Sequence, residues 1–268
     1  MVDPYADCKI GLESSRKEKP LRIVALTRRS VLAGALFTEA LIRDHQVVAI
    51  VAESRITRLT GNWPRYLYNR LRDQGIRRLL RHLVKTIYAR IARSDSVEEV
   101  HARRPDVPYY EVASINDPDA VEIIRSHAPD LIVIGATRVA QKPVLDIPLW
   151  GCINIHGAML PRNAGVEPTF WALMKEEWDS IGVTIHYAVE QVDAGDIVLQ
   201  ERVPFALGET PDEIDERIMG YGAELASKAV TSIATGEAHP VPLDMSEYIL
   251  NPRPTAKQRR QMRRKIRE

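Results

Sequence analysis

The chain has 268 residues, of which 45% are hydrophobic and 27% are charged, proportions typical of a globular protein with one sizeable domain. No apolar run approaches the roughly 18 residues that a membrane-spanning helix needs, and no cationic start followed by an apolar core marks a secretory signal. The net charge of +1 conceals two basic segments described below. We therefore expect a cytoplasmic protein.

Short apolar runs alternate with helical patterns along most of the chain. We predict strands at residues 21–27, 46–52, 109–112, 131–135, 152–155, 182–189 and 196–203. Helices are predicted from Val31 to Arg43 with Ser30 as the cap, from Asp117 to about Ala128, and from about Pro211 to Ala234. This alternation predicts an α/β fold, a Rossmann-like twisted and mainly parallel sheet with helices on both faces. The ligand crevice of such a sheet lies beyond the carboxyl ends of its strands.

The basic residues gather in two places. Residues 55–93 contain eleven Lys and Arg and one acid, a net charge of +10, and residues 251–268 contain eight and one, a net charge of +7. The remainder of the chain therefore carries −16. The two cysteines, Cys8 and Cys152, form neither a metal-binding spacing nor a disulfide framework, so we expect no metal site.

The first basic segment is predicted to be a helical insertion over residues 55–95. Apolar residues recur at helical spacing from Ile76 to Ile91, and Lys and Arg cover most of the remaining positions. The helix either packs on the acidic body of the protein or lies, through residues 63–93, on an anionic membrane surface. The tail from Lys257 to Arg267 either adds to that attraction or is a solvated end. We expect no nucleic-acid partner, because no stacking aromatics accompany the tail.

Three polar residues have the chemistry needed to move a one-carbon acyl group onto an amine. Asn154 and His156 are two apart on a predicted strand, so they share a face, and Asp193 must reach them from elsewhere in the fold. Asn154 would donate to the oxygen that gains negative charge, protonated His156 would add a charged donor, and Asp193 would keep His156 protonated. Through a water, Asp193 would also accept the proton that the amine releases. The alternative is that each residue only satisfies buried backbone groups.

The motifs around these residues resemble the formyltransferases that use 10-formyltetrahydrofolate. The resemblance runs from about Leu21 to Ile233 and is densest in residues 128–134, 151–157, 160–161, 165–168, 171–173, 182–186 and 193–200. The chain departs from the family at Ala158, where Ser is usual, and at Ala164–Gly165, where Arg–Gly is usual. The resemblance implies that residues 21–235 form the catalytic domain, preceded by an arm over residues 1–20 and followed by a basic extension over residues 236–268.

The resemblance also implies which residues form the site. It assigns catalysis to Asn154, His156 and Asp193. The pterin of the cofactor would be held largely by main chain from two segments, which comprise Arg138, Val139 and Gln141 after the fourth strand, and Ala188, Val189, Glu190, Gln191 and Val192 before the catalytic carboxylate. Relatives that act on a phosphoribosyl substrate have a glycine-rich loop after the first strand. Here that turn holds Arg28 and Arg29, which either clamp a phosphate or are solvated.

The function implied is transfer of a formyl group from 10-formyltetrahydrofolate to a primary amine, that of a nucleotide-linked or lipid-linked amino sugar. The alternatives are a glycinamide ribonucleotide formyltransferase, a hydrolase of 10-formyltetrahydrofolate, and a binding module with the same fold. Methionyl-tRNA is not expected as the acceptor, because relatives with that role carry a further β-barrel and only 33 residues follow Thr235. A protein that acts on lipid-linked acceptors would be peripheral at the membrane. The oligomeric state does not follow from the sequence.

Overall fold

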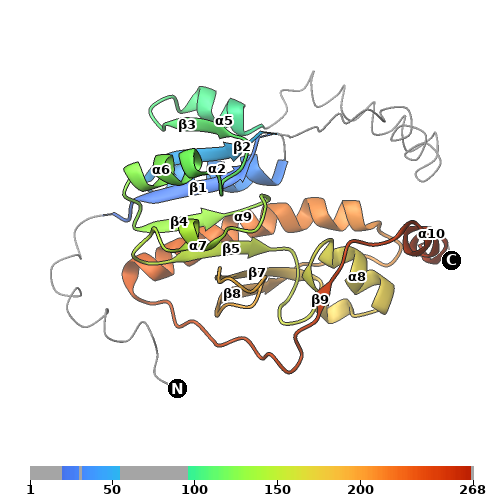
Figure 1. Cartoon of the computed structure of the whole chain (residues 1–268). Coiled ribbons are helices and arrows are strands. Elements are labelled where there is room, and N and C mark those ends of the chain that lie inside the picture. Colours follow the sequence, from blue (N-terminus) through green and yellow to red (C-terminus); the bar gives the residue numbers. More distant parts are fainter. Residues whose placement is uncertain (1–19, 30–31, 55–95, 267–268) are drawn as a thin grey trace.

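A seven-stranded sheet forms the centre of the computed structural model, which describes residues 20–29, 32–54 and 96–266 (Figure 1). Its strand order is β3-β2-β1-β4-β5-β7-β8. The strands are β1 (Ile23–Arg28), β2 (Val47–Glu53), β3 (Tyr109–Val112), β4 (Leu131–Ile134), β5 (Cys152–His156), β7 (Gly182–Tyr187) and β8 (Ile197–Arg202). The first five pair in parallel, β7 is antiparallel to β5, and β8 is antiparallel to β7. The predicted mainly parallel sheet is confirmed.

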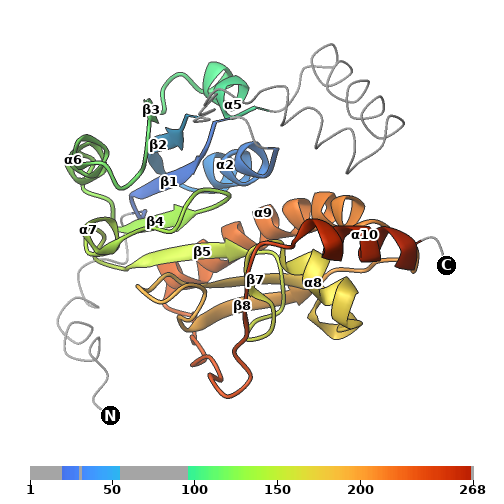
Figure 2. The same ribbon diagram turned by 45° about the vertical axis from the view of Figure 1, so that its right-hand side comes forward.

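Helices cover both faces of this sheet (Figure 2). Along β1, Ile23 and Ala25 enter a core shared with helices α2 (Leu32–Asp44), α5 (Val97–Arg103) and α9 (Pro211–Thr235). The alternate residues Val24 and Leu26 enter a second core beneath α6 (Pro118–Ser126) and α7 (Lys142–Leu145). Burial on both faces explains why the central strands are continuous apolar runs. No helix in the described ranges is long and apolar enough to cross a membrane.

The predicted strands and helices begin and end within about three residues of the observed ones wherever they are described. The long helix α9 begins at a capping box formed by Thr210 and Glu213 and ends at Gly236, which has a positive φ. Several predictions fall outside the described residues. These are residues 1–19 of the arm, the Ser30 cap with Val31, the insertion at 55–95, and Arg267 in the tail.

The chain after α9 runs past the edge strand β8. Val241 forms a bridge with Ile197 of β8, and the short strand β9 (Leu250–Asn251) pairs in parallel with β6 (Ala164–Gly165). Helix α10 (Ala256–Lys265) then packs on α8 (Pro168–Lys175), which is followed by a 3-10 turn at Trp178–Ser180. Met262 of α10 is buried, and Arg259 donates two hydrogen bonds of 2.7 and 2.6 Å to Glu167. Met262 and Arg259 therefore hold α10 against the body of the protein, while Lys257, Arg260 and Arg264 are exposed to solvent.

Candidate active site

A row of polar side chains crosses from β5 to β7 near the carboxyl end of β5. The antiparallel register places Asn154 opposite His186 and His156 opposite Thr184. Because directly opposed residues of an antiparallel pair have neighbouring side chains on one face, strand pairing brings both pairs together. Asn154 and His156 share the face of Cys152, and they lie farther along the strand, toward the predicted crevice.

Asp193 reaches this row from the loop between β7 and β8. Its Oδ2 accepts a 2.8 Å hydrogen bond from the Gly165 amide and lies 3.4 Å from His156 Nδ1. Its Oδ1 accepts a long 3.4 Å hydrogen bond from Asn154 Nδ2 and lies 3.5 Å from His186 Nε2. The carboxylate side chain is only 11% exposed. The structure thus brings the three sequence-predicted catalytic residues into one cluster, with Asp193 at its centre.

The imidazole of His156 is buried and has a partner at each nitrogen. Its Nε2 lies 3.0 Å from the Asn163 carbonyl oxygen and its Nδ1 faces Asp193. Burial lowers the pKa of His156, and nearby His186 lowers it further, although Asp193 and the Asn163 carbonyl act in the opposite direction. The expectation that Asp193 keeps His156 protonated stays a prediction. With a hydrogen on Nε2, His156 donates to the Asn163 carbonyl, and its Nδ1 is placed to exchange a proton with Asp193.

The Asp193 carboxylate is ionised at neutral pH. Burial alone would raise its pKa, but His156, His186 and the Gly165 amide outweigh burial and bring the pKa to about 2. A proton that reaches His156 Nδ1 would therefore face a carboxylate, while Nε2–H keeps its bond to the Asn163 carbonyl. The arrangement can accept one proton from a reacting group and stabilise the resulting charge.

Two further residues complete the cluster, and neither was predicted from the sequence. His186 donates from Nδ1 to the Tyr187 carbonyl at 2.8 Å, so its Nε2 accepts from the Asn154 amide at 3.1 Å. A signal for His186 existed, because it follows Thr184 at strand spacing in the predicted strand 182–189. Asn163, fully buried with a positive φ of 57°, had none, since its partners are distant in the chain.

The two segments predicted to bind the cofactor lie close together beside this cluster. Lys142, which follows Gln141, has its Nζ 3.9 Å from Glu190 Oε1. Val139 and Val189 are 52% and 38% exposed, so each segment offers apolar surface. Main-chain groups from Val189 to Gln191 make no backbone–backbone hydrogen bond within the described residues. Apolar surface beside free main-chain donors and acceptors fits a flat ring with polar edges, such as a pterin.

Other predicted cofactor contacts are already engaged within the protein. Asn116 donates to the Val139 carbonyl at 3.0 Å and accepts from the Gln141 amide at 2.9 Å. The Arg138 guanidinium pairs with the buried Glu53 and donates to the Ala113 carbonyl. Ala188 donates its amide to the Cys152 carbonyl at 2.7 Å, and the Val192 carbonyl accepts from Tyr248 at 2.6 Å. The portion from Val189 to Gln191 is therefore the better candidate for main-chain recognition.

The two candidate phosphate-binding arginines have different surroundings. Arg29 pairs with Glu98 of α5 and with Glu111 of β3, the second pair at 2.9 Å. These carboxylates raise the pKa of Arg29, the Glu111 hydrogen bond most strongly, and they neutralise its charge. Arg28 has no ion-pair partner among the described residues. Of the two, Arg28 is therefore the better candidate for a phosphate contact, judged on the described ranges.

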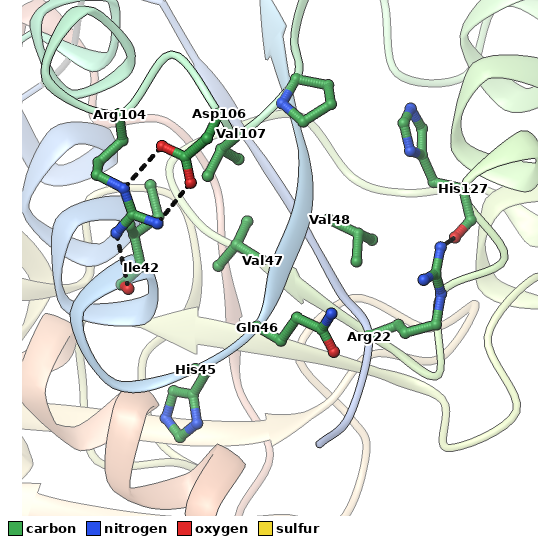
Figure 3. Close-up of a pocket in the computed structure, with 11 residues that line it drawn as sticks. Arg22, Ile42, His45, Gln46, Val47, Val48, Arg104, Asp106, Val107 and His127 are labelled. Atoms are coloured by element: carbon green, nitrogen blue, oxygen red, sulfur yellow. Dashed lines mark hydrogen bonds and ion pairs between the residues drawn. The ribbon is translucent and has the colours of Figure 1, made fainter. Parts of the chain in front are cut away.

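A cavity of about 390 Å³ lies at the other end of the strands, beside the amino ends of β1 and β2 (Figure 3). The charged side chains that line it make hydrogen bonds and ion pairs within the protein. Arg104 pairs with Asp106 and donates to the Ile42 carbonyl, and Arg22 donates to the His127 carbonyl. Within the described ranges, no cluster of His, Cys, Asp and Glu side chains is suited to a metal ion. The cluster of Asn154, His156 and Asp193 lies away from this cavity, near the carboxyl end of β5.

Comparisons with known proteins place the chain among formyltransferases. A family model described as formyl transferase matches residues 66–230. The methionyl-tRNA formyltransferase of Syntrophus aciditrophicus is 38% identical over 154 residues, which cover 57% of this chain and 48% of that protein. That of Geobacillus thermodenitrificans is 33% identical over 54% of this chain and 45% of the relative. The chain thus spans about half the length of the curated relatives that it matches.

Solved structures share the fold over a larger part of the chain. Glycinamide ribonucleotide transformylase 1 from Symbiobacterium toebii is similar with a TM-score of 0.56 and 22% identity, over 84% of this chain and 95% of that one. A Mycobacterium tuberculosis protein described as a likely sugar N-formyltransferase has a TM-score of 0.56 and 19% identity, over 92% of this chain and 87% of that one. At these identities the likeness concerns the fold.

Proposed function

The chain belongs to the formyl transferase family, and from this premise we propose that it transfers a formyl group from 10-formyltetrahydrofolate to a primary amine. One observation carries the proposal, the convergence of Asn154, His156 and Asp193 near the carboxyl end of β5. Main chain from Val189 to Gln191, with the exposed Val139 and Val189, would hold the pterin. The bound donor supplies an activated formyl group whose carbon the amine attacks.

Asn154 is suited to stabilise the negative charge that develops on the formyl oxygen. One N–H of its amide is engaged by His186 at 3.1 Å, which fixes the orientation of the amide plane. The other makes only a 3.4 Å contact with Asp193, so turning it toward a substrate oxygen sacrifices little. A donor aimed at developing charge contributes about 3–4 kcal/mol to transition-state stabilisation.

Asp193 and His156 are suited to handle the protons. The attacking amine must lose a proton, and the ionised Asp193 is its acceptor, directly or through a water. His156 Nδ1, 3.4 Å from the carboxylate, takes up the proton or shares it. The nitrogen that leaves the formyl carbon must gain a proton, which the same pair returns. No covalent bond to the protein is required.

We propose an amino sugar as the acceptor. Supporting this choice, the similar M. tuberculosis structure described as a likely sugar N-formyltransferase matches 92% of this chain. Methionyl-tRNA is a second candidate, because the curated relatives that match at 38% and 33% identity bear that name. The sequence alone had not led us to expect methionyl-tRNA as an acceptor.

The basic segment at 63–93 bears on where the acceptor is located. Its charge would draw it to an anionic membrane surface, which suits a lipid-linked amino sugar. Co-sedimentation with anionic and neutral vesicles at two salt concentrations tests this part of the proposal. Greater binding to anionic vesicles that weakens with salt is expected, and equal binding to both would refute the membrane interaction.

The activity is tested by incubating the purified chain with 10-formyltetrahydrofolate and one acceptor at a time. The acceptors are an amino sugar nucleotide, methionyl-tRNA and glycinamide ribonucleotide, with a reaction lacking amine beside them. Formylated product from the amino sugar supports the proposal, and product from another acceptor identifies that one instead. Turnover without amine would mean a hydrolase, and donor binding without any turnover would mean a binding module.

Replacement of Asn154 by Ala tests the role of the cluster. We expect kcat to fall by about 10²–10³ with the affinity for the donor little changed, because the transition-state charge loses a hydrogen-bond donor that binding of the formyl donor does not need. Replacement of His156 by Ala should abolish activity while the protein stays folded. Gln46→Ala is the control, because Gln46 lines the cavity by the amino ends of β1 and β2. This variant should keep the rate of the unaltered protein. An Asn154→Ala variant with full activity would remove this residue from the mechanism.

A further inference from the structure

We propose that two side chains of the segment 240–252, here called the C-terminal strap, position the catalytic residues. Tyr248 is a positioning residue for Asp193, and Asn251 is a positioning residue for His156. The proposal rests on the proposed function in assigning those two residues to the reaction. It is carried by hydrogen bonds that join the strap to both segments holding the cluster.

Tyr248 fixes the peptide immediately before Asp193. Its hydroxyl donates a 2.6 Å hydrogen bond to the carbonyl of Val192. Asp193 has a φ of 50°, in the left-handed region that an Asp adopts only at a cost, so its conformation must be held by its surroundings. Burial raises the pKa of the Tyr248 hydroxyl, and the negative charge of nearby Asp193 raises it further. Tyr248 therefore remains a neutral donor at the place where the backbone turns.

The strap also controls the amide that binds the Asp193 carboxylate. Strand β9 pairs with β6 so that Leu250 is opposite Ala164 and Asn251 is opposite Gly165. The Asn251 carbonyl accepts from the Val166 amide at 3.2 Å, next to the Gly165 amide that donates to Asp193 at 2.8 Å. A Cβ at Gly165 would lie 2.5 Å from the Asn251 carbonyl oxygen, so the two strands approach as closely as glycine permits. The strap thereby sets the position of the Gly165 amide.

Asn251 reaches the other side of the cluster through Asn163. Its buried Nδ2 donates to Asn163 Oδ1 at 3.0 Å, and its Oδ1 accepts from Lys175 Nζ at 3.1 Å. The Asn163 amide in turn donates to Glu177 and to Ser180 at 2.7 and 2.8 Å. With its side chain fixed in this network, Asn163 directs its main-chain carbonyl at His156 Nε2. The orientation of the catalytic imidazole therefore depends on a residue almost a hundred positions later.

Both ends of the strap are anchored without help from Tyr248. At the start, Val241 exchanges two 2.8 Å backbone hydrogen bonds with Ile197, and Leu243 packs against Leu160 and Ala164. At the end, Trp171 Nε1 donates to the Pro252 carbonyl at 2.9 Å. Loss of the Tyr248 hydroxyl should therefore leave the path of the strap unchanged. The effect of this hydroxyl on the position of Asp193 can then be measured by itself.

The test compares Tyr248→Phe with Glu247→Gln in the full chain. The first removes the hydroxyl and keeps the ring. The second changes the neighbouring residue in the sequence and breaks the exposed 3.1 Å ion pair between Glu247 and Arg162. It serves as the matched control. We expect Tyr248→Phe to lower kcat about tenfold with KM for the formyl donor changed less than twofold, and Glu247→Gln to leave both constants unchanged. Thermal melting of both variants checks that they are folded.

An NMR titration of the His156 ring gives a readout that does not require turnover. Because Asp193 opposes the effect of burial on His156, a less well held carboxylate should lower the pKa of His156 in Tyr248→Phe and not in Glu247→Gln. An unchanged titration and an unchanged kcat in Tyr248→Phe would overturn the proposal, and so would equal losses in both variants. If the unaltered protein formylates no acceptor, the proposed function fails, and the titration still decides whether the strap positions Asp193.

Discussion

Asp215 has an environment that favours the protonated form of its side chain. It lies in the first turns of α9, where burial, together with the nearby acids Asp212 and Glu167, raises its pKa from 3.8 to about 6. A carboxyl whose pKa is higher in the folded than in the unfolded state contributes stability that is fully present below the unfolded pKa. That contribution is lost as the pH rises from about 4 through about 6. At neutral pH, Asp215 is therefore ionised at a cost to stability.

Replacement of Asp215 by Asn should therefore stabilise the protein at pH 8 and change little at pH 4. A shift of about two pKa units corresponds to a gain of about 2–3 kcal/mol in the free energy of unfolding at pH 8. Urea unfolding followed by circular dichroism at the two pH values measures it. The exposed neighbour Glu216→Gln should shift stability by no more than about 0.5 kcal/mol at either pH. Destabilisation of Asp215→Asn at pH 8 would contradict this account of the carboxyl.

At the scale of elements, the pairing of β6 with β9 depends on glycine at position 165. Gly165 has a φ of 94°, and the Asn251 carbonyl occupies the space that a side chain would need. Gly165→Ala should lower the free energy of unfolding by about 1–2 kcal/mol, because alanine is strained at this positive φ. Displacement of β9 by the new side chain should lower it further. It should also lower kcat about tenfold or more, since the Gly165 amide shifts away from Asp193.

A matched control for this variant is present in the same chain. Gly208 also has a positive φ, 91°, but no atom lies within 4 Å of the place where its Cβ would be. Gly208→Ala should therefore show the backbone cost alone, with kcat unchanged. Thermal melts and steady-state rates of the two variants separate the contributions. Equal losses of kcat would show that the close approach of β9 is unimportant to the site.

The strands of the main sheet were predictable because each is a short apolar run buried on both faces. Leu131–Ile134, for example, is entirely buried. Strands β6 and β9 were not, because each has two residues and forms only by pairing with a partner 86 positions away. Helices α5 and α10 were missed although both carry a readable signal. Ser96 with Glu99 and Thr255 with Gln258 form capping boxes at their starts.

Some residues of the site were likewise predictable from local patterns, and others were revealed only by the fold. Asn154 and His156 were placed on one face by their spacing, and Asp193 was identified through the resemblance to a family. The effect of burial on the pKa of His156 was not predicted, because burial of the ring is a property of the packed molecule and no local pattern reports it. Tyr248 and Asn251 carry no local signal, since their partners lie 56 and 88 residues away.

At the scale of the whole molecule, Cys152 reports on the opening of the sheet. It begins β5, is 2% exposed, and burial raises the pKa of its thiol to about 12. In a Cys8→Ser background, iodoacetamide at pH 8 should therefore modify the folded protein only as fast as it unfolds. Mass spectrometry with increasing urea measures the rate, which should follow the unfolding transition. Rapid modification without urea would contradict the burial of this strand.

The connection between β6 and β9 has a consequence for how the protein becomes active during translation. A ribosome extends the chain from its amino terminus, and the sheet as far as β8 can begin to organise once residue 202 has emerged. Asp193 and His156, however, acquire their last supports only when Asn251 arrives. A nascent polypeptide halted before that point would carry every reactive side chain and still lack a competent centre.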